Sequence, residues 1–145
     1  MSNQARNIIE NAISGSLGTI AEDGSPFVSL VTIAAVDPTT LVMLLSGLAK
    51  HTQNLDQRSA CSLLLVQPGG EGGDPLAGAR LTISGTATRL ERGQDAQARE
   101  TFLAKHEAAS MYADFGDFAF FEIDVREAHL VAGFGRIETI LAEAL

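Results

Sequence analysis

The sequence has few of the residues that hold small extracellular or zinc-dependent folds together. It contains one cysteine, Cys61, among 145 residues, so it can form neither an internal disulfide nor a cysteine-based zinc site. Tryptophan is absent and there are only four prolines. With 46% hydrophobic residues the chain is nevertheless too apolar for an intrinsically disordered protein. We therefore expect one globular domain over residues 1–145, folded around a hydrophobic core.

Positive charge and long apolar runs are also scarce. Ten Lys and Arg residues stand against eighteen Asp and Glu, which gives a formal net charge of −8. A field of that sign repels nucleic-acid phosphates and anionic lipid headgroups, so neither is an expected partner. No apolar run approaches the roughly 18 residues of a membrane span, and the N-terminus lacks the pattern of a signal peptide. We expect a cytoplasmic protein that binds neither membranes nor nucleic acid.

The hydrophobic pattern predicts a chain rich in strands. Alternation is clearest in segment 80–90, where Leu81 and Ile83 share one face and hydroxyl side chains share the other. Asp23-Gly24 lies between two apolar runs and predicts a tight hairpin, whose two turn residues both take positive φ. The expected strands are 17–22, 26–36, 41–46, 60–66, 80–90, 118–125 and 129–132.

Helical spacing predicts a few short helices around these strands. They are an N-terminal helix that stops at Gly15 and the segments 50–58, 94–107 and 136–145. Because consecutive strands follow one another through hairpin-type links, a doubly wound parallel sheet is excluded. The pattern favours a mainly β (α+β) fold, a mostly antiparallel barrel with short peripheral helices.

Few side chains are arranged for catalysis or metal binding. The three histidines lack the spacing of metal ligands, so no metal site is expected. Cys61 lies in an apolar run, which is typical of a buried thiol and not of a nucleophile. The sequence contains no Gly-x-Ser-x-Gly motif, so it offers no support for a serine hydrolase.

One junction could bind an anion. Segment 41–55 runs from an apolar strand through a turn into a helix, and Ser46, Lys50, His51 and Thr52 lie where the two meet. Free N–H groups at a helix start, together with hydroxyls and a cation, can hold a phosphate. The alternative is an ordinary surface helix that Thr52 or Ser46 caps.

Five segments, in order along nearly the whole chain, carry a family resemblance. They are residues 18–31, 46–55 (SGLAKHTQNL), 74–85, 112–118 (YADFGDF) and 132–136 (AGFGR). In this combination they resemble the pyridoxamine 5′-phosphate oxidase-related FMN-binding split barrels, and within that superfamily the haem-utilisation branch.

The resemblance implies a six-stranded antiparallel split β-barrel with short peripheral helices. It also implies a homodimer that binds two FMN molecules in clefts between the subunits and acts on a small-molecule substrate. Ten residues take positions of cofactor contacts in the family: Ser29, Leu30 and Val31 at the flavin ring, Lys50 and His51 at the phosphate with the Ser46 and Thr52 hydroxyls, Arg80 at the flavin, and Phe134 and Arg136 on the C-terminal loop.

The chain departs from the family's enzymes at known positions. The oxidases carry Arg and Lys where this chain has Ser29 and Ala34, and their C-terminal Arg-x-His motif is missing, so pyridoxamine phosphate oxidation is not expected. Haem-degrading relatives ligate haem through a His in a further C-terminal segment, and this chain ends at Leu145. An FMN-dependent oxidoreductase is the leading hypothesis. The alternatives are a non-catalytic flavin or haem-binding protein of haem utilisation, and a relict barrel with an empty cleft.

Overall fold

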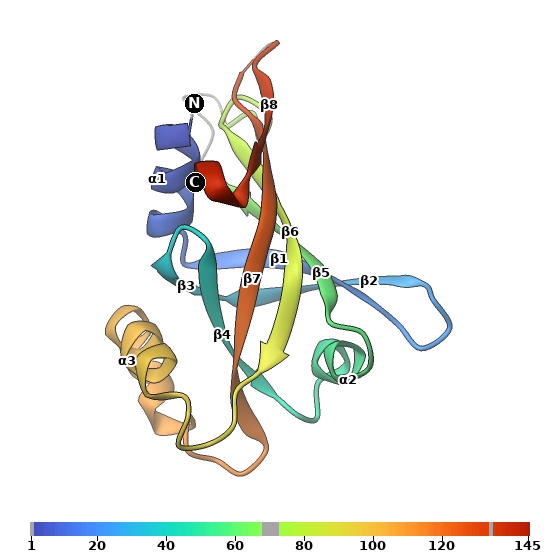
Figure 1. The fold of residues 1–145 in the computed structure, drawn as a ribbon, viewed down its shortest axis with the longest axis vertical. Helices are drawn as coiled ribbons and strands as arrows, with labels where there is room; N and C mark the ends of the chain where they lie inside the picture. The colour runs from blue at the N-terminus through green and yellow to red at the C-terminus, as the bar shows by residue number, and fades with distance from the viewer. Residues whose placement is uncertain (1, 68–72, 134) are drawn as a thin grey trace.

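The computed structural model describes residues 2–67, 73–133 and 135–145, whose fold Figure 1 shows. The helices are α1 (Ser2–Asn11), α2 (Lys50–Gln57) and α3 (Ala96–Lys105), with 3₁₀ turns η1 (Glu107–Met111) and η2 (Ala142–Ala144). The strands are β1 (Ser14–Ile20), β2 (Pro26–Thr32), β3 (Ala34–Asp37), β4 (Thr40–Ser46), β5 (Ala60–Val66), β6 (Arg80–Arg89), β7 (Phe118–Val131) and β8 (Ile137–Leu141).

All strand pairs of the sheet are antiparallel. The strands follow the order β2-β1-β5-β6-β7-β4-β3, and β8 pairs with the second half of β7. The sheet curls so that β2 and β4, which lie far apart in this order, approach each other again. The result is a barrel that is open between two of its strands, and the expected antiparallel split barrel is confirmed, with eight described strands where six were expected.

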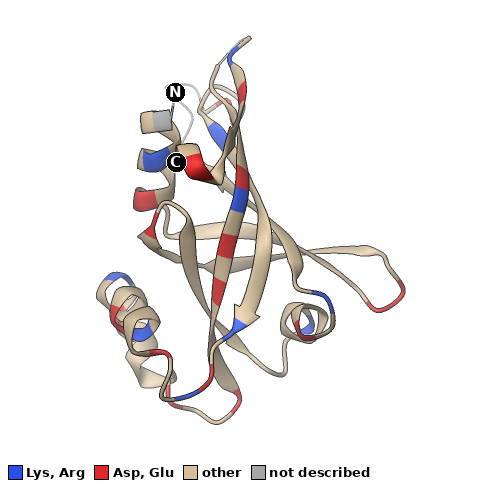
Figure 2. Cartoon of the chain, viewed as in Figure 1, with Lys and Arg blue, Asp and Glu red and all other residues tan. Residues whose placement is uncertain are grey.

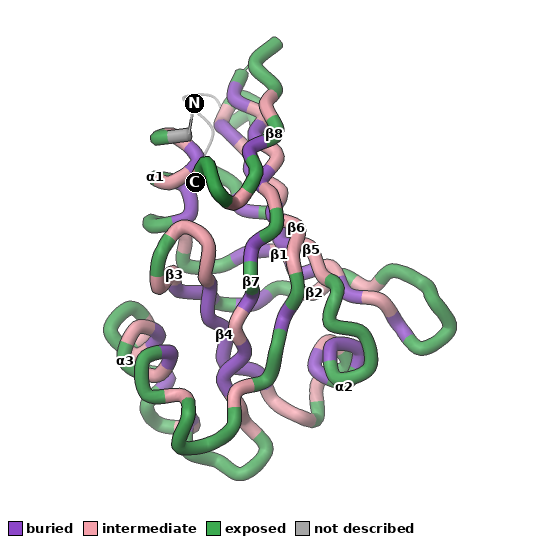
Figure 3. The backbone as a smooth tube through the Cα atoms, viewed as in Figure 1, coloured by how far each residue is buried: buried purple, intermediate pink, exposed green. Residues whose placement is uncertain are grey.

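The alternating pattern of the strands places one set of apolar side chains inside the barrel. Leu17, Leu41, Leu81, Ile83 and Ile123 are fully buried there, as the alternation in 80–90 predicts for β6. A second, smaller cluster lies on the outside of β3, β4 and β7, where α3 covers it. Figure 3 shows the buried inner strands and the exposed loops at the ends of the sheet.

Three sequence predictions about strands and helices are wrong in detail. The expected strand 26–36 is divided at Ile33, which is fully buried and separates β2 from β3. The expected pair 118–125 and 129–132 is one continuous strand, because a bulge at Arg126 absorbs the irregular residue without breaking the ladder to β6. The expected helix 136–145 is instead strand β8 followed by η2, since its Ile137–Leu141 segment pairs with β7.

The hairpin between β1 and β2 is longer than the two-residue turn that Asp23-Gly24 predicts. Gly24 alone has a positive φ, of 88°, and the loop closes with the Ala21 N–H donating to the Ser25 carbonyl oxygen at 2.8 Å. The Asp23 carboxylate accepts hydrogen bonds from the Ser25 N–H and hydroxyl. These bonds close the turn without a positive φ at Asp23.

The outer face of the sheet is covered unevenly. Helix α3 packs over β3, β4 and part of β7, while α2 contacts β1, β2 and β6 (Figure 1). Acidic and basic residues gather on the helices, the loops and the outward side of β7 (Figure 2). Among the described helices, none combines the length and hydropathy needed to cross a membrane.

Candidate functional site

A cavity lies where the barrel is open, between β2, β4 and the start of α2. Its volume is about 310 Å³. Its walls come from β2, from the end of β4 and the turn that follows, and from the start of β7: Leu30, Val31, Thr32, Leu44, Leu45, Ser46, Ala49, His51 and Phe118. Most of these side chains are aliphatic or aromatic, and His51 is the imidazole among them. This apolar hollow with one nitrogen base is the candidate site.

His51 lies at the second position of α2 and faces β2. Its Nδ1 is 3.0 Å from Oγ of Ser29, across 22 residues of sequence. The ring is half-buried, and this burial lowers the pKa of His51 below its ordinary value of 6.5. The imidazole is therefore neutral at pH 7, with one nitrogen engaged by a hydroxyl.

Lys50, one position earlier, faces a different hollow. Its ammonium lies 5.0 Å from the centroid of the Phe27 ring. It lines a cavity of about 690 Å³ between the β1–β2 hairpin and the polar side of α2. Hydrogen bonds from Ser25 and the nearby Lys50 charge together hold the pKa of Asp23 below its ordinary value. The two adjacent basic residues thus do not converge on one point.

The hydroxyls at the junction also separate. Oγ of Ser46 donates to the Asp117 carboxylate at 3.0 Å and accepts the Leu48 N–H at 3.1 Å, so it ties the turn to the start of β7. Thr52 is fully buried and its Oγ1 has no hydrogen-bond partner. The residue at the N-cap of α2 is Ala49, without a side-chain cap, so neither Thr52 nor Ser46 caps this helix.

Arg80 and Arg136, which were also expected to contact the cofactor, lie far from this cavity of the same chain. Arg80 begins β6 at the end of the sheet that carries β8, and its guanidinium donates to the Leu76 carbonyl oxygen at 3.0 Å. Arg136 lines a separate cavity of about 390 Å³ with Gln4 and Gln67. Phe134 lies outside the described residues. The structure therefore brings together Leu30, Val31, Ser46 and His51 around the candidate cavity, and Ser29 contacts His51.

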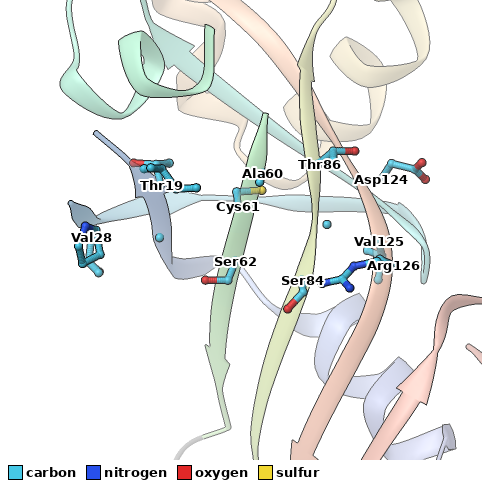
Figure 4. Close-up of a pocket in the computed structure, with 14 residues that line it drawn as sticks. Thr19, Val28, Ala60, Cys61, Ser62, Ser84, Thr86, Asp124, Val125 and Arg126 are labelled. Carbon is cyan, nitrogen blue, oxygen red and sulfur yellow. The ribbon is translucent and has the colours of Figure 1, made fainter. Parts of the chain in front are cut away.

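A larger groove that the sequence reasoning missed crosses the outer face of the sheet (Figure 4). Its volume is about 810 Å³, and side chains of β1, β2, β5, β6 and β7 line it. Gly18, Ser62 and Ser84 lie opposite one another on neighbouring strands, and their small side chains form its floor. The pairing of small residues across three strands could have indicated this groove. It becomes visible only when the register of the strands is known.

Arg126 and Cys61 also line this groove. The Arg126 side chain projects into the groove from the bulge of β7. Cys61 is largely buried, and burial raises the pKa of its thiol to about 11, so the thiolate is scarce at neutral pH. Nowhere in the described part of the chain do three His, Cys, Asp or Glu side chains gather as metal ligands.

Comparison with known proteins connects this geometry to a family. The family model described as "CREG, beta-barrel" matches residues 1–144. Among curated proteins, the non-canonical heme oxygenase HOZ, chloroplastic, of Arabidopsis thaliana is 32% identical over 134 residues, which is 90% of this chain and 40% of that protein. The chain thus spans less than half of this relative.

Solved structures show the same fold. A heme binding protein from Mycobacterium smegmatis superposes with a TM-score of 0.90 at 35% identity, over 97% of this chain and 57% of that one. A protein of the pyridoxinephosphate oxidase family from Clostridium acetobutylicum, related to general stress protein 26, has a TM-score of 0.74 at 14% identity, over 97% and 94% of the two chains. At that identity the second match carries the fold alone.

Proposed function

The chain belongs to the CREG β-barrel family, and from that premise we propose that it binds haem at the cavity between β2 and β4, as a haem-utilisation protein. The observation that carries the proposal is His51, a neutral imidazole held by Ser29 at the wall of an apolar hollow. Two relatives above 30% identity are named for haem, one for binding it and one as an oxygenase.

The residues of this cavity would contact one part of such a group. A haem needs apolar surface for its porphyrin and a ligand for its iron, most often a histidine. The cavity supplies both through Leu30, Leu44, Phe118 and His51. A porphyrin is larger than this hollow, and the apolar surface continues past it along β2, where Val28 is 67% and Leu30 76% exposed. When bound, haem would supply redox chemistry, and the chain's own residues would hold it and limit access of water.

FMN is the second candidate ligand, and with it an oxidoreductase acting on a small molecule. The start of α2 has no side-chain cap and the Thr52 hydroxyl beside it is unpartnered, which suits a phosphate. The fold shared with a protein of the pyridoxinephosphate oxidase family is compatible with a flavin but does not argue for one. Against it, Ser29 and Ala34 supply no cation, and the Lys50 ammonium is turned toward Phe27.

Titrations with haem and with FMN discriminate between the two candidates. We expect haem to give a saturable shift of its Soret band and FMN to give weaker quenching of its fluorescence. Tight FMN binding without a Soret shift would favour the flavin. In that case the Lys50 side chain would have to turn from Phe27 to the phosphate, and Lys50→Glu should then weaken FMN by more than ten- to a hundredfold through loss of that contact and added repulsion. Riboflavin, which lacks the phosphate, is the control.

A further inference from the structure

We propose that one end of the molecule docks a partner protein, through a segment of that partner in which apolar side chains stand among Lys and Arg. The docking surface comes from the turn after β4, from η1 and from the loop between η1 and β7. We call it the aromatic patch, and it consists of Leu48, Met111, Tyr112, Phe115 and Phe118. Docking there does not depend on which cofactor the chain binds.

Two segments that are distant in sequence meet in the aromatic patch. The Gly47 N–H donates to the Asp117 carbonyl oxygen, which brings Leu48 to the start of β7. The ring of Phe118, the first residue of β7, packs against the ring of Phe115 with centroids 6.5 Å apart. Both segments lie in the lower part of the molecule in Figure 1. The patch is therefore one surface and not scattered exposed residues.

The large side chains of the patch are not used by the protein's own core. Leu48 and Met111 are each 80% exposed, and Phe115 is 57% exposed. The opposite side of the same loop is packed, since Ala109 and Ala113 belong to the smaller core cluster under α3. Exposed Met and aromatic side chains grouped in this way are typical of the centre of a protein interface.

The loop that carries the patch is tied down before any partner binds. The Arg92 guanidinium donates to the carbonyl oxygens of Phe115, at 2.6 Å, and of Phe118, at 3.1 Å. The Ala113 N–H donates to the Ala109 carbonyl oxygen at 2.9 Å. A surface that is already ordered loses less conformational entropy when it is covered, so more of the contact energy contributes to affinity.

The charges beside the patch favour a basic partner. Four carboxylates come from the loop between η1 and β7 and from the loop that Arg92 ties to it: Glu91, Asp95, Asp114 and Asp117. Figure 2 shows acidic residues along these loops. The two guanidinium groups among them are engaged within the chain, Arg92 with the loop carbonyls and Arg99 with the Asp114 carboxylate at 2.6 Å. Lysines or arginines of a partner would complement this excess of negative charge.

The same charges argue against a second copy of the chain at the patch. In a two-fold symmetric contact the patch would meet itself, so Asp114 and Asp117 would face their own counterparts. Like charges opposed across an interface are unfavourable. Anionic lipid headgroups and nucleic-acid phosphates are repelled for the same reason. An amphipathic segment with a basic rim, such as a helix that presents one apolar face, suits both the apolar side chains and the carboxylates.

Two synthetic peptides test the proposal on the full chain. Both carry leucines at helical spacing, and the remaining positions are lysine in one peptide and glutamate in the other. We expect the lysine peptide to shift the amide NMR resonances of residues 46–49 and 111–118. Its affinity, measured by fluorescence anisotropy, should exceed that of the glutamate peptide by roughly tenfold or more, and added salt should reduce the difference.

Single substitutions locate the contact. Phe115→Ser and Met111→Ser should each weaken the lysine peptide by roughly tenfold, which is typical of a residue at the centre of an interface. Ile13→Ser is the matched control, because Ile13 is also well exposed, at 61%, but lies between α1 and β1. It should bind the peptide as the unmodified protein does. Circular dichroism checks that the variants are folded, which their exposure favours.

Four results would overturn the proposal. They are the absence of lysine-peptide binding at about 1 mM, resonance shifts confined to other surfaces, equal affinity for the two peptides, and equal weakening by Phe115→Ser and Ile13→Ser. A change in the light-scattering mass of Phe115→Ser relative to the unmodified protein would assign the patch to a second copy and overturn it as well. Failure of haem or FMN to bind would leave the docking surface unaffected.

Discussion

Neighbouring residues at the open edge of the barrel place their side chains in two different cavities. His51 and Lys50 are adjacent on α2, yet one meets Ser29 and the other meets Phe27. A residue step on a helix turns the side chain by about 100°, so neighbours in sequence face different surroundings. The sequence predicts an anion site at this junction. Which cavity each basic side chain enters depends on the rotation of α2 against β2, and no local sequence pattern determines that rotation.

Glycine at position 85 is required by the bulge of β7. A Cβ there would collide with the Asp124 carbonyl oxygen and crowd the Val125 backbone. We expect Gly85→Ala to lower the free energy of unfolding by about 1–3 kcal/mol, measured by urea denaturation. Gly116→Ala is the control, since a Cβ at Gly116 meets nothing within 4 Å, and its change should be small. Equal stabilities of the two variants would contradict the close approach.

Cys61 should be slow to alkylate. With its pKa raised to about 11, its thiolate fraction at pH 7.5 is lower than that of an ordinary thiol by roughly a hundredfold or more. We expect iodoacetamide labelling, followed by mass spectrometry, to be slow at neutral pH and to accelerate as pH rises toward 11. Labelling in urea should be fast, and Cys61→Ser should show none. Rapid labelling of the folded protein at pH 7.5 would show that the thiol is exposed.

At the scale of elements, α2 is the part of the fold that sets the site. It is anchored from below by Asn54, whose Nδ2 donates to the buried Thr19 hydroxyl of β1 at 3.0 Å. Arg58, just past the helix, donates to the Ala21 carbonyl oxygen at 3.1 Å. These contacts fix the helix against β1 and its hairpin, and through the helix they fix the position of His51.

Removing the internal anchor should therefore affect both stability and binding. We expect Asn54→Ala to lower the free energy of unfolding by about 1–3 kcal/mol, because it leaves the Thr19 hydroxyl buried without its donor. Haem affinity should fall in the same variant. Gln53→Ala, an exposed change on the same helix, should stay within about 0.5 kcal/mol. An Asn54→Ala protein as stable as Gln53→Ala would mean that the pair does not anchor α2.

Most strands could be predicted from period-two alternation, and β5 and β6 match their expected bounds within one residue. The failures have a common physical cause. The segment that becomes β8 has helix-forming alanines and glutamates at its end, but Ile137 and Ile140 pair with β7 through contacts distant in sequence. Likewise the bulge at Arg126 is defined by the register of β7 against β6, which pairs residues distant in sequence.

At the scale of the whole molecule, the outer face of the sheet exposes large apolar side chains among polar ones. Three rows of paired residues cross it: Val28–Gly18–Ser62–Ser84–Glu127–Leu141, Leu30–Ser16–Leu64–Thr82–His129–Thr139, and Val66–Arg80–Val131–Ile137. Val28, Leu30, Val66, Ile137 and Leu141 are each more than half exposed. Several exposed apolar side chains on one face are typical of an interaction site. We propose that a second copy of the chain covers it, in a homodimer.

The dimer has a direct test. Light scattering should give about twice the 15.3 kDa mass of one chain, because such an interface buries on the order of 2,000 Å². Ile137→Lys should convert the protein to monomer by placing a charge in the third row of this face. Met111→Lys changes another exposed apolar residue, on η1, and should leave the mass unchanged. A monomer mass for the unmodified protein at micromolar concentration would contradict the proposal.

The positions of the cofactor residues that the family resemblance implies can also be considered for the whole molecule. One chain gathers Ser29, Leu30 and His51 at its cavity but leaves Arg80 and Arg136 at the other end of the sheet. Sequence comparison assigns residues to a cofactor without saying which chain supplies them. In a homodimer, the residues of one chain can approach a cavity of the other, so the dimer bears on the site as well as on stability.

Haem titration of the unmodified protein, followed by absorbance, tests the central claim most directly. The account predicts a saturable Soret shift with increasing protein concentration. Bovine serum albumin and haem alone serve as references for non-specific uptake and for free haem. A spectrum identical to that of free haem at every protein concentration would contradict haem binding at the His51 cavity.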